Sequence, residues 1–278
     1  MHTTLSRIFD VSAHADQPFF LIAGPCVLEN EEMGFPIAAQ ILEITERLAI
    51  PFIFKASYRK ANRTKGKSFT GIGNEKALAI LDNIRKDLNI PVLTDVHAIS
   101  EVQTAAGFVD VLQIPAFLCR QTDLLEAAGA AGRVVNIKKG QFMSPESMQH
   151  AAEKVLKGGC KTIWVTERGT TFGYNDLVVD FRSIPVMKNF IAPEVKVVLD
   201  ATHSLQRPNQ GSGISGGSPG FIETIASAGI AAGADGIFLE THPDPVRAKS
   251  DAGSMLPLDK LEGLLHKLVG IREAIRGQ

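Results

Sequence analysis

Six cations and no acid lie between Lys55 and Gly73, although the formal net charge of the whole chain is only -1. The cations are Lys55, Arg59, Lys60, Arg63, Lys65 and Lys67. An apolar run, 51–54, precedes this stretch, and glycines stand within and after it. Such a concentration of positive charge is typical of a strand that runs into an anion-binding loop. A solvated basic loop is the alternative, and the rest of the chain favours the anion site.

Charged and polar residues also stand at the ends of short apolar runs elsewhere in the chain. Buried strands seldom carry such residues unless the residues have a task. For single residues a structural role is the alternative, because Asp95 or Asp200 can cap the next helix and Lys139 can face solvent. Repetition of the pattern over seven of the eight runs favours an active site. The residues are Lys55, Asp95, His97, Gln113, Lys138, Lys139, Glu167, Arg168, Asp200, His203, Glu240 and His242.

The apolar runs alternate with segments of helical periodicity. Strands are predicted at about 19–26, 51–58, 91–97, 111–117, 134–140, 162–169, 195–203 and 236–242. Helices are predicted at 31–49, 75–88, 99–107, 121–131, 145–158, about 176–190, 220–233 and 257–276. This alternation predicts an α/β fold, a (β/α)8 TIM barrel, in which the C-terminal strand ends build the active site. A doubly wound open sheet is the weaker alternative.

The composition places further limits on the protein. With 278 residues, 45% of them hydrophobic, the chain is long enough for one barrel, and no linker divides it. We expect a single domain, 1–278, with 1–18 as a short N-terminal cap. The near-zero net charge argues against nucleic-acid binding. No apolar run of about 18 residues and no leader is seen, so we expect no membrane span and a cytoplasmic location, which suits three widely separated cysteines.

Two groups of candidate site residues differ in their chemistry. The cations Lys55, Lys60, Arg63, Lys138 and Arg168 come from three strand ends that meet at one mouth, and they suffice for more than one phosphate or carboxylate group.

The second group is Cys26, His203, Glu240 and Asp251, from the first, seventh and eighth strands and the loop after the eighth. These strands are neighbours in a closed barrel, so the four side chains can surround a divalent transition metal. The spacing alone is a weak signal. Cys26 as a packed apolar side chain and His203 as a catalytic or hydrogen-bonded imidazole remain the alternatives.

Long sequence blocks, in order along nearly the whole chain, resemble the 3-deoxy-D-manno-octulosonate 8-phosphate synthases. The blocks include AGPCVLEN at 23–30, KASYRKANR at 55–63, NIKKGQFMSP at 136–145, DATHSLQ at 200–206 and ETHPDPVRAKSDAGSMLPL at 240–258. The related 3-deoxy-D-arabino-heptulosonate 7-phosphate synthases typically have Lys-Pro-Arg where this chain has Lys60-Ala61-Asn62-Arg63, and the Ala-Asn form favours the eight-carbon product. The chain departs from the family pattern at Lys65 and Thr70.

The resemblance implies condensation of phosphoenolpyruvate with arabinose 5-phosphate and water, which releases inorganic phosphate. It implies a homotetramer in which a neighbouring subunit's Arg reaches the sugar phosphate. Phosphoenolpyruvate would be bound by Lys60, Lys138 and Arg168, with Lys55, Ser57 and Gln113 lining the same pocket. Asn62, Arg63 and Thr64 would hold arabinose 5-phosphate. The catalytic candidates are Lys60, Lys138, His203 and Asp95, the last to orient a substrate hydroxyl or a lysine.

The resembled family divides at the position of Cys26. Members with Asn there work without a metal, whereas members with Cys bind a divalent metal through residues that match Cys26, His203, Glu240 and Asp251. The resemblance therefore implies the metal-dependent class. A thiolate is a soft ligand, so Fe, Zn, Co or Mn is expected rather than Mg.

Two other functions remain open at this point. The first is a heptulosonate synthase that uses erythrose 4-phosphate. The second is a barrel that binds phosphosugars without catalysis. We also expect Cys119 and Cys160 to be packed thiols, Trp164 to lie in the core, and 207–219 to form an active-site loop.

Overall fold

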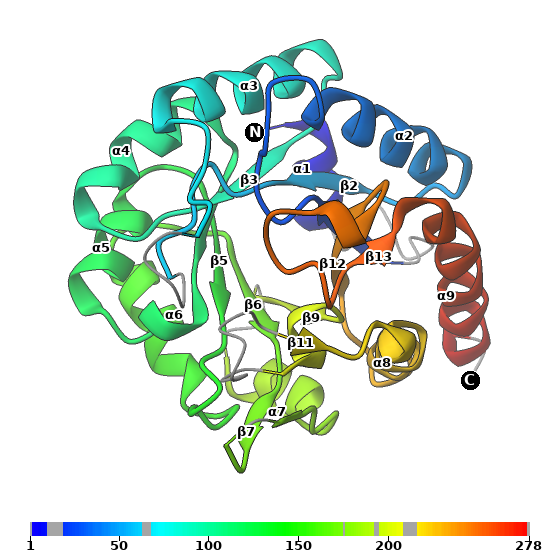
Figure 1. Cartoon of the computed structure of the whole chain (residues 1–278). Helices are drawn as coiled ribbons and strands as arrows, with labels where there is room; N and C mark the ends of the chain where they lie inside the picture. The colour runs from blue at the N-terminus through cyan, green and yellow to red at the C-terminus, as the bar shows by residue number, and fades with distance from the viewer. Residues whose placement is uncertain are drawn as a thin grey trace.

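A closed barrel of parallel strands forms the centre of the protein, as the computed structural model shows (Figure 1). The structure describes residues 2–9, 19–62, 68–174, 176–191, 195–207 and 216–276. Within these residues eight parallel strands pair in chain order, and the pairing of the first with the last closes the ring. The predicted (β/α)8 barrel is confirmed. The strands are β1 (Phe20–Gly24), β2 (Phe52–Lys55), β3 (Val92–Asp95), β4 (Val111–Ile114), β5 (Val134–Lys138), β6 (Ile163–Glu167), β9 (Lys196–Asp200) and β12 (Gly236–His242).

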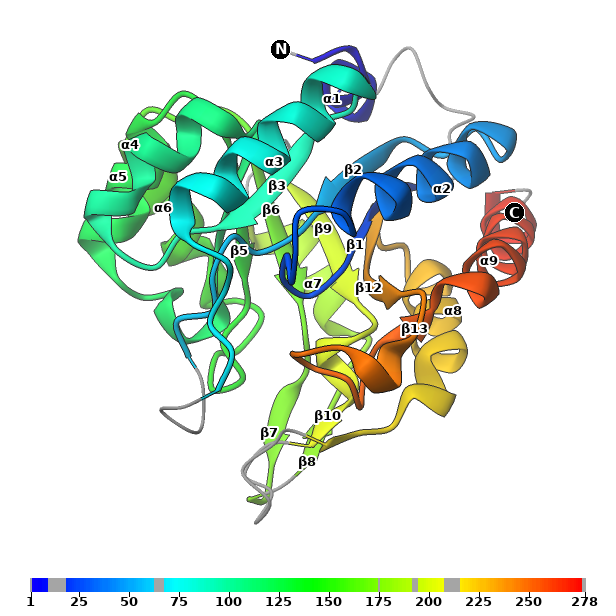
Figure 2. The same ribbon diagram turned by 45° about the horizontal axis from the view of Figure 1, so that its top comes forward.

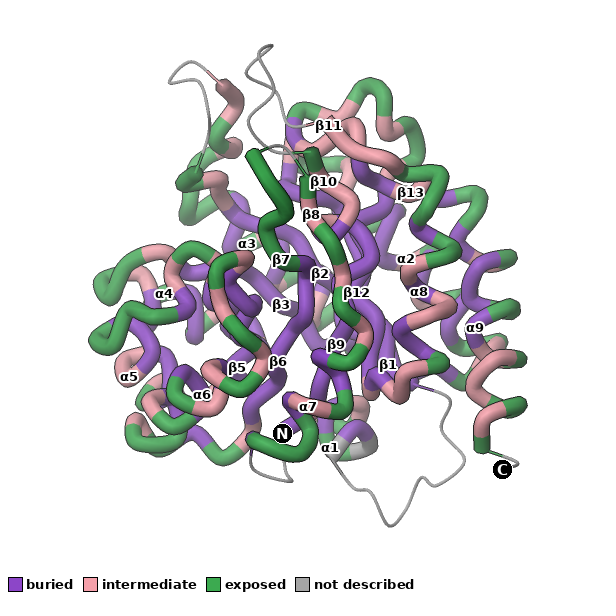
Figure 3. The backbone as a smooth tube through the Cα atoms, turned by 90° about the horizontal axis from the view of Figure 1, so that it is seen from below, coloured by how far each residue is buried: buried purple, intermediate pink, exposed green. Residues whose placement is uncertain are grey.

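A helix follows each barrel strand and packs on the outside of the ring (Figure 1). Each helix presents a buried apolar face to the strands and an exposed polar face to solvent, as the burial colours in Figure 3 show. The helices are α2 (Gly34–Arg47), α3 (Asn74–Asp87), α4 (Ile99–Phe108), α5 (Thr122–Ala130), α6 (Met148–Lys157), α7 (Ser183–Phe190), α8 (Ile222–Ala231) and α9 (Leu261–Arg276).

The helix predicted over 176–190 is wrong in its first half. The chain forms an antiparallel hairpin there, with strands β7 (Thr170–Phe172) and β8 (Asp176–Val178), and the helix α7 begins only at Ser183. The β-branched residues of these strands favour extended backbone. Gly173 takes a φ of 66° in the turn, a conformation that glycine adopts without steric cost.

Short elements complete the mouth of the barrel. Strand β10 (Gln206–Arg207) pairs with β11 (Gly216–Gly217), and β13 (Leu256–Pro257) adds to β12. Single-turn 3-10 helices are η1 (Ala116–Leu118), η2 (His203–Leu205), η3 (Pro219–Phe221), η4 (Pro245–Arg247) and η5 (Leu258–Lys260). Most of the loop predicted over 207–219 lies outside the described residues.

The N-terminal cap is a helix, α1 (Thr3–Phe9), that closes one end of the barrel. Leu5 and Ile8 are buried in the same apolar cluster as the inward side chains of the strands, among them Phe20, Trp164 and Phe238. In Figure 2 this helix lies at the end of the barrel opposite β7, β8 and β10. Residues 2–9 of the predicted cap thus contain a helix with two side chains in this apolar cluster, and Trp164 is a core residue as predicted. This apolar plug leaves the opposite end free for polar groups.

The remaining expectations for the chain concern cysteines and membrane spans. Cys26, Cys119 and Cys160, all within the described residues, are buried and form no disulfide, so Cys119 and Cys160 are packed thiols. Among the described residues, no helix has the length and apolar character needed to cross a membrane.

Packing of α8 against the barrel predicts opposite effects for two glycine substitutions. A Cβ atom on Gly229 would lie 2.0 Å from Cδ2 of the buried Leu199, whereas one on Gly270 would meet no described atom within 4 Å. We expect Gly229→Ala to lower the free energy of unfolding by about 1–3 kcal/mol through overpacking. Gly270→Ala, the matched control in α9, should raise it by about 0.5–1 kcal/mol. Urea denaturation measures both, and a stabilised Gly229→Ala variant would contradict this packing.

Candidate active site

A cavity of about 660 Å³ opens among the C-terminal strand ends and the loops that follow them. Most of the predicted site residues line it. Of the others, Cys26 and Glu240 lie beside the cavity through their contacts with its lining, and Arg63 and Thr64 lie outside the described residues. The predicted residues in the lining are Lys55, Ser57, Lys60, Asn62, Asp95, Gln113, Lys138, Arg168, His203 and Asp251.

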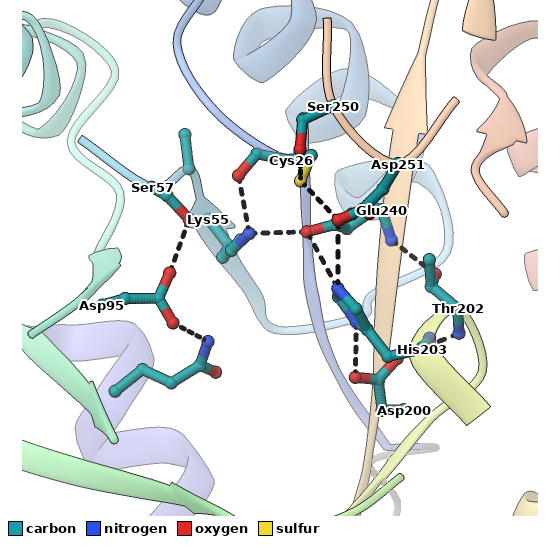
Figure 4. A network of polar contacts seen from close by, with 12 residues as sticks. Cys26, Lys55, Ser57, Asp95, Asp200, Thr202, His203, Glu240, Ser250 and Asp251 are labelled. Atoms are coloured by element: carbon teal, nitrogen blue, oxygen red, sulfur yellow. Dashed lines mark hydrogen bonds and ion pairs between the residues drawn. The ribbon is translucent and has the colours of Figure 1, made fainter. Parts of the chain in front are cut away.

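Lys55 forms a buried ion pair at one side of the cavity. Its ammonium donates to Oε1 of Glu240 at 2.7 Å and to the carbonyl oxygen of Cys26 at 2.9 Å, joining the ends of β2, β12 and β1 (Figure 4). Burial alone would lower the pKa of Lys55, but the Glu240 carboxylate raises it above its usual value. Lys55 therefore stays charged and holds Glu240 in position.

Three ligand types meet beside this ion pair. The Cys26 sulfur and one carboxylate oxygen each of Glu240 and Asp251 all lie within 4.8 Å of one another. Nε2 of His203 lies 3.5 Å from Oε1 of Glu240 and 3.8 Å from Oδ2 of Asp251. Oε2 of Glu240 is buried and has no hydrogen-bond partner in the described part of the chain. A soft sulfur, an imidazole nitrogen and an unsatisfied carboxylate oxygen together fit a divalent transition metal.

The Cys26 thiol is protonated in the metal-free site. Its Sγ donates to Oδ2 of Asp251 at 2.9 Å. Burial raises the pKa of Cys26 well above its usual value, and the nearby carboxylates of Asp251 and Glu240 raise it further. A metal that binds the sulfur must therefore displace this proton.

Asp200, at the end of β9, joins the cationic wall of the cavity to His203. Its Oδ2 accepts hydrogen bonds from Nζ of Lys138 at 2.6 Å and from Nδ1 of His203 at 2.8 Å (Figure 4 shows the contact with His203). Burial would raise the pKa of Asp200, but His203 and Lys138 hold it well below its usual range. Burial lowers the pKa of Lys138 to about 8, because its effect outweighs the attraction of Asp200.

A chain of side-chain hydrogen bonds crosses five neighbouring strands on the other side of the cavity. Ser57 Oγ and Gln113 Nε2 both donate to the carboxylate of Asp95, each at 2.6 Å. Asn136 donates to Gln113 Oε1 at 2.8 Å, and Thr166 donates to Asn136 Oδ1 at 2.7 Å. The ionised Asp95 can only accept, so the hydrogen bonds on both sides point toward it, and this fixes the orientation of the Gln113 amide.

Arg168 offers an unused donor at the cavity. One terminal nitrogen, Nη2, donates to Oε1 of Gln206 at 3.0 Å. The other, Nη1, is buried and has no hydrogen-bond partner among the described residues. A buried guanidinium donor without an acceptor favours an anionic ligand at this point.

The structure shows whether Asp95 and Asp200 cap helices and whether Lys139 faces solvent. Lys139 does not face solvent: it is fully buried, with Nζ 3.2 Å from Oγ1 of Thr170 and 3.4 Å from Oε1 of Glu167. Asp95 bonds side chains and does not cap a helix. Asp200 does both, because its Oδ1 accepts from the backbone nitrogens that open η2.

Several cavity residues escape sequence reasoning. Gln141, Gln206 and Phe117 follow barrel strands in the chain, and as neutral side chains they add nothing to a charge pattern. Lys249 lies two residues before Asp251, and its ammonium lies 4.7 Å from the ring centroid of Phe69 across the mouth. In the sequence, its positive charge is the feature that could have indicated Lys249 as a cavity residue.

Comparison with known protein families assigns the chain to one of them. The DAHP synthetase I family matches residues 2–276. The chain belongs to this family.

This chain matches several curated relatives over nearly the whole length of both proteins. A protein of Aromatoleum aromaticum is 51% identical over 272 residues, which is 97% of this chain and 96% of the relative. A protein of Desulfotalea psychrophila is 50% identical over 96% of this chain and 94% of its own. One of Koribacter versatilis is 52% identical over 92% of both. Each is named 2-dehydro-3-deoxyphosphooctonate aldolase, so the resemblance stated from the motifs is confirmed.

The lowered pKa of Lys138 predicts how anion binding depends on pH. Sulfate, whose charge is constant in this range, should bind about tenfold more weakly at pH 9 than at pH 7, because a group with a pKa of about 8 loses most of its protons in that interval. Isothermal titration calorimetry measures this affinity. Lys138→Arg, which stays charged, should remove most of the decline. An equally steep decline in that variant would assign the titration to another group.

Proposed function

We propose that the protein condenses phosphoenolpyruvate with D-arabinose 5-phosphate and water to give 3-deoxy-D-manno-octulosonate 8-phosphate and inorganic phosphate. The observation that carries this is the near-full-length similarity to aldolases of the octulosonate phosphate, at 51% identity over 97% of the chain. The cavity supports it, because its cations stand where two multiply charged substrates need them.

In this reaction C3 of phosphoenolpyruvate forms a bond to the aldehyde carbon of the sugar. Water adds at C2, and the phosphate leaves when its C–O bond breaks. Lys60, Lys138 and Arg168 bind the phosphate and carboxylate of phosphoenolpyruvate, and the open Nη1 of Arg168 supplies one donor. These fixed cations also stabilise the negative charge that develops during the addition.

The proton required by the new hydroxyl group is assigned to Lys138. Its pKa of about 8 makes its ammonium a better acid near neutral pH than that of Lys55, whose pKa is raised. Its position, with Nζ over the ring of Phe238 at 3.2 Å from the centroid, is fixed by Asp200. Proton transfer therefore comes from a group that is held in one place, and a proton released by the water that adds at C2 restores the ammonium of Lys138.

Sugar recognition is assigned to the Asp95 side of the cavity. The hydroxyl proton of Ser57 is committed to Asp95, so both residues present oxygen lone pairs that accept from substrate hydroxyls. Asn62 lines the same cavity, and Arg63 and Thr64 are assigned to the same sugar from sequence alone. The buried hydrogen-bond chain through Gln113 keeps this acceptor surface in a single arrangement.

A divalent Fe, Zn, Co or Mn ion is proposed as the cofactor, held by Cys26, His203, Glu240 and Asp251. When bound, such an ion supplies Lewis acidity at the sugar aldehyde or the attacking water. The orphaned Oε2 of Glu240 supports this assignment, and the thiol disfavours Mg.

We further propose a homotetramer in the cytoplasm. Exposed Phe117, Phe142 and Phe172, on the loops after β4, β5 and β6, offer apolar surface for contact between subunits near the mouth.

A comparison of two aldoses tests the function. Phosphate release from phosphoenolpyruvate by the metal-loaded protein should be at least tenfold faster, per enzyme, with arabinose 5-phosphate than with erythrose 4-phosphate. Release mainly with erythrose 4-phosphate would assign a heptulosonate synthase. Release with neither aldose, alongside tight binding of phosphoenolpyruvate, would favour a barrel that binds phosphosugars without catalysis.

Metal removal tests the cofactor. Exhaustive chelation should abolish phosphate release, and Co, Mn or Zn should restore it. Because the Cys26 thiol is protonated without metal, the metal affinity should rise by about tenfold per pH unit below the thiol pKa. Cys26→Ala should lose the metal, whereas Cys119→Ala, which removes a buried thiol outside the group, should keep it. Full activity after chelation would refute the metal assignment.

A further inference from the structure

We propose that Asp200 is a positioning residue that fixes the tautomer of His203, so that Nε2 always presents its lone pair to Glu240 and Asp251. The inference deepens the proposed metal site and rests on it. Asp200 does not belong to the four proposed metal ligands, and the one of them to which it hydrogen-bonds in the described part of the chain is His203.

The contacts of Asp200 allow only one arrangement of protons. Its Oδ1 accepts from the backbone nitrogens of Thr202 at 2.9 Å and His203 at 2.8 Å, and backbone nitrogens can only donate. Its Oδ2 accepts from the Lys138 ammonium at 2.6 Å, which also can only donate. With three obligate donors around it, the fully buried carboxylate is an acceptor on both oxygens.

The imidazole of His203 must therefore donate from Nδ1. That nitrogen lies 2.8 Å from Oδ2 of Asp200, so the proton of the neutral ring sits on Nδ1. Nε2 is then the unprotonated nitrogen, and it lies 3.5 Å from Glu240 and 3.8 Å from Asp251. A carboxylate on the far nitrogen of a ligating imidazole sets the tautomer and increases its affinity for a metal.

Thr202 fixes Asp200 and Glu240 relative to each other. Thr202 donates its backbone N–H to Asp200, while its Oγ1 accepts the backbone N–H of Glu240 at 2.8 Å (Figure 4). The ring of His203 also lies against Phe238, with 5.6 Å between the ring centroids. The imidazole is therefore limited in both rotation and protonation before any metal arrives.

Asp200→Asn reverses the arrangement without a change in size. The two backbone donors keep the amide oxygen at the Oδ1 position, which places the amide NH2 against both Nδ1 of His203 and Nζ of Lys138. The Lys138 ammonium then loses its acceptor and must turn away, whereas the imidazole of His203 can change its tautomer. Nδ1 must then accept, and the ring proton moves to Nε2. A protonated Nε2 cannot bind a metal, so the affinity for zinc should fall about 10–100-fold.

The first experiment needs no variant of Asp200. In metal-free protein labelled with nitrogen-15 in histidine, at a pH where the ring is neutral, His203 should show the Nδ1–H tautomer. His203→Gln identifies its signals. An Nε2–H tautomer in the wild-type protein would overturn the proposal whatever the activity of the enzyme.

The second experiment compares two aspartates. Asp235 makes similar contacts away from the mouth, because it accepts from a backbone nitrogen, that of Val197, and from the ammonium of Lys188, both at 2.8 Å. Asp200→Asn should show the Nε2–H tautomer and weakened binding of zinc alone in competition with a chelator. Asp235→Asn should show neither, and urea denaturation checks that both variants fold. Unchanged tautomer and zinc affinity in Asp200→Asn would overturn the proposal. A failure of the aldose comparison would instead overturn the proposed function, and it would leave these two readouts unaffected.

Discussion

The structure depends on burying opposite charges together at the C-terminal ends of the strands. The pairs Lys55 with Glu240 and Lys138 with Asp200 are both almost entirely removed from water. Each charge alone would carry a large desolvation cost in this position, so each residue is stable there only while its partner is present. Removal of one partner leaves a buried charge without compensation, which is far more harmful than exchange of both. The cationic wall and the carboxylates beside Cys26 thus stabilise one another.

The barrel makes this arrangement possible by separating apolar from polar ends. At the N-terminal end, α1 and the inward side chains fill the interior with hydrocarbon. Phe238 marks the boundary, because it belongs to that apolar cluster while its ring faces the ammonium of Lys138 and the imidazole of His203. Above it, fixed dipoles and charges line the cavity. A polar site on a rigid, closely packed floor keeps its geometry when ligands arrive.

The fold is largely predictable from the sequence because its signals are local. A strand buried on both faces reads as a continuous apolar run, and all eight runs become strands. The hairpin of β7 and β8 is not predictable in this way, because its strands are short and largely exposed and lack the apolar pattern of a buried strand.

The site is predictable where charge at a strand end or a family motif marks it. The cations and the proposed metal ligands carry such a signal, and those of them that the structure describes meet around one cavity. Asn136 and Thr166 act through hydrogen bonds between strands far apart in sequence, and their neutral side chains look like ordinary core polar residues. The burial of Lys139 is equally hidden, because solvent exposure at a strand end depends on loops that fold over it.

We propose that one cavity holds an anion on its cationic wall and a metal ion beside Cys26. The most direct test is the anomalous diffraction of crystals soaked with cobalt and phosphoenolpyruvate. We predict a cobalt peak bound to Cys26, His203, Glu240 and Asp251, and phosphate density against Lys60, Lys138 and Arg168. A cobalt peak away from Cys26, or phosphoenolpyruvate bound outside this cavity, would contradict the account.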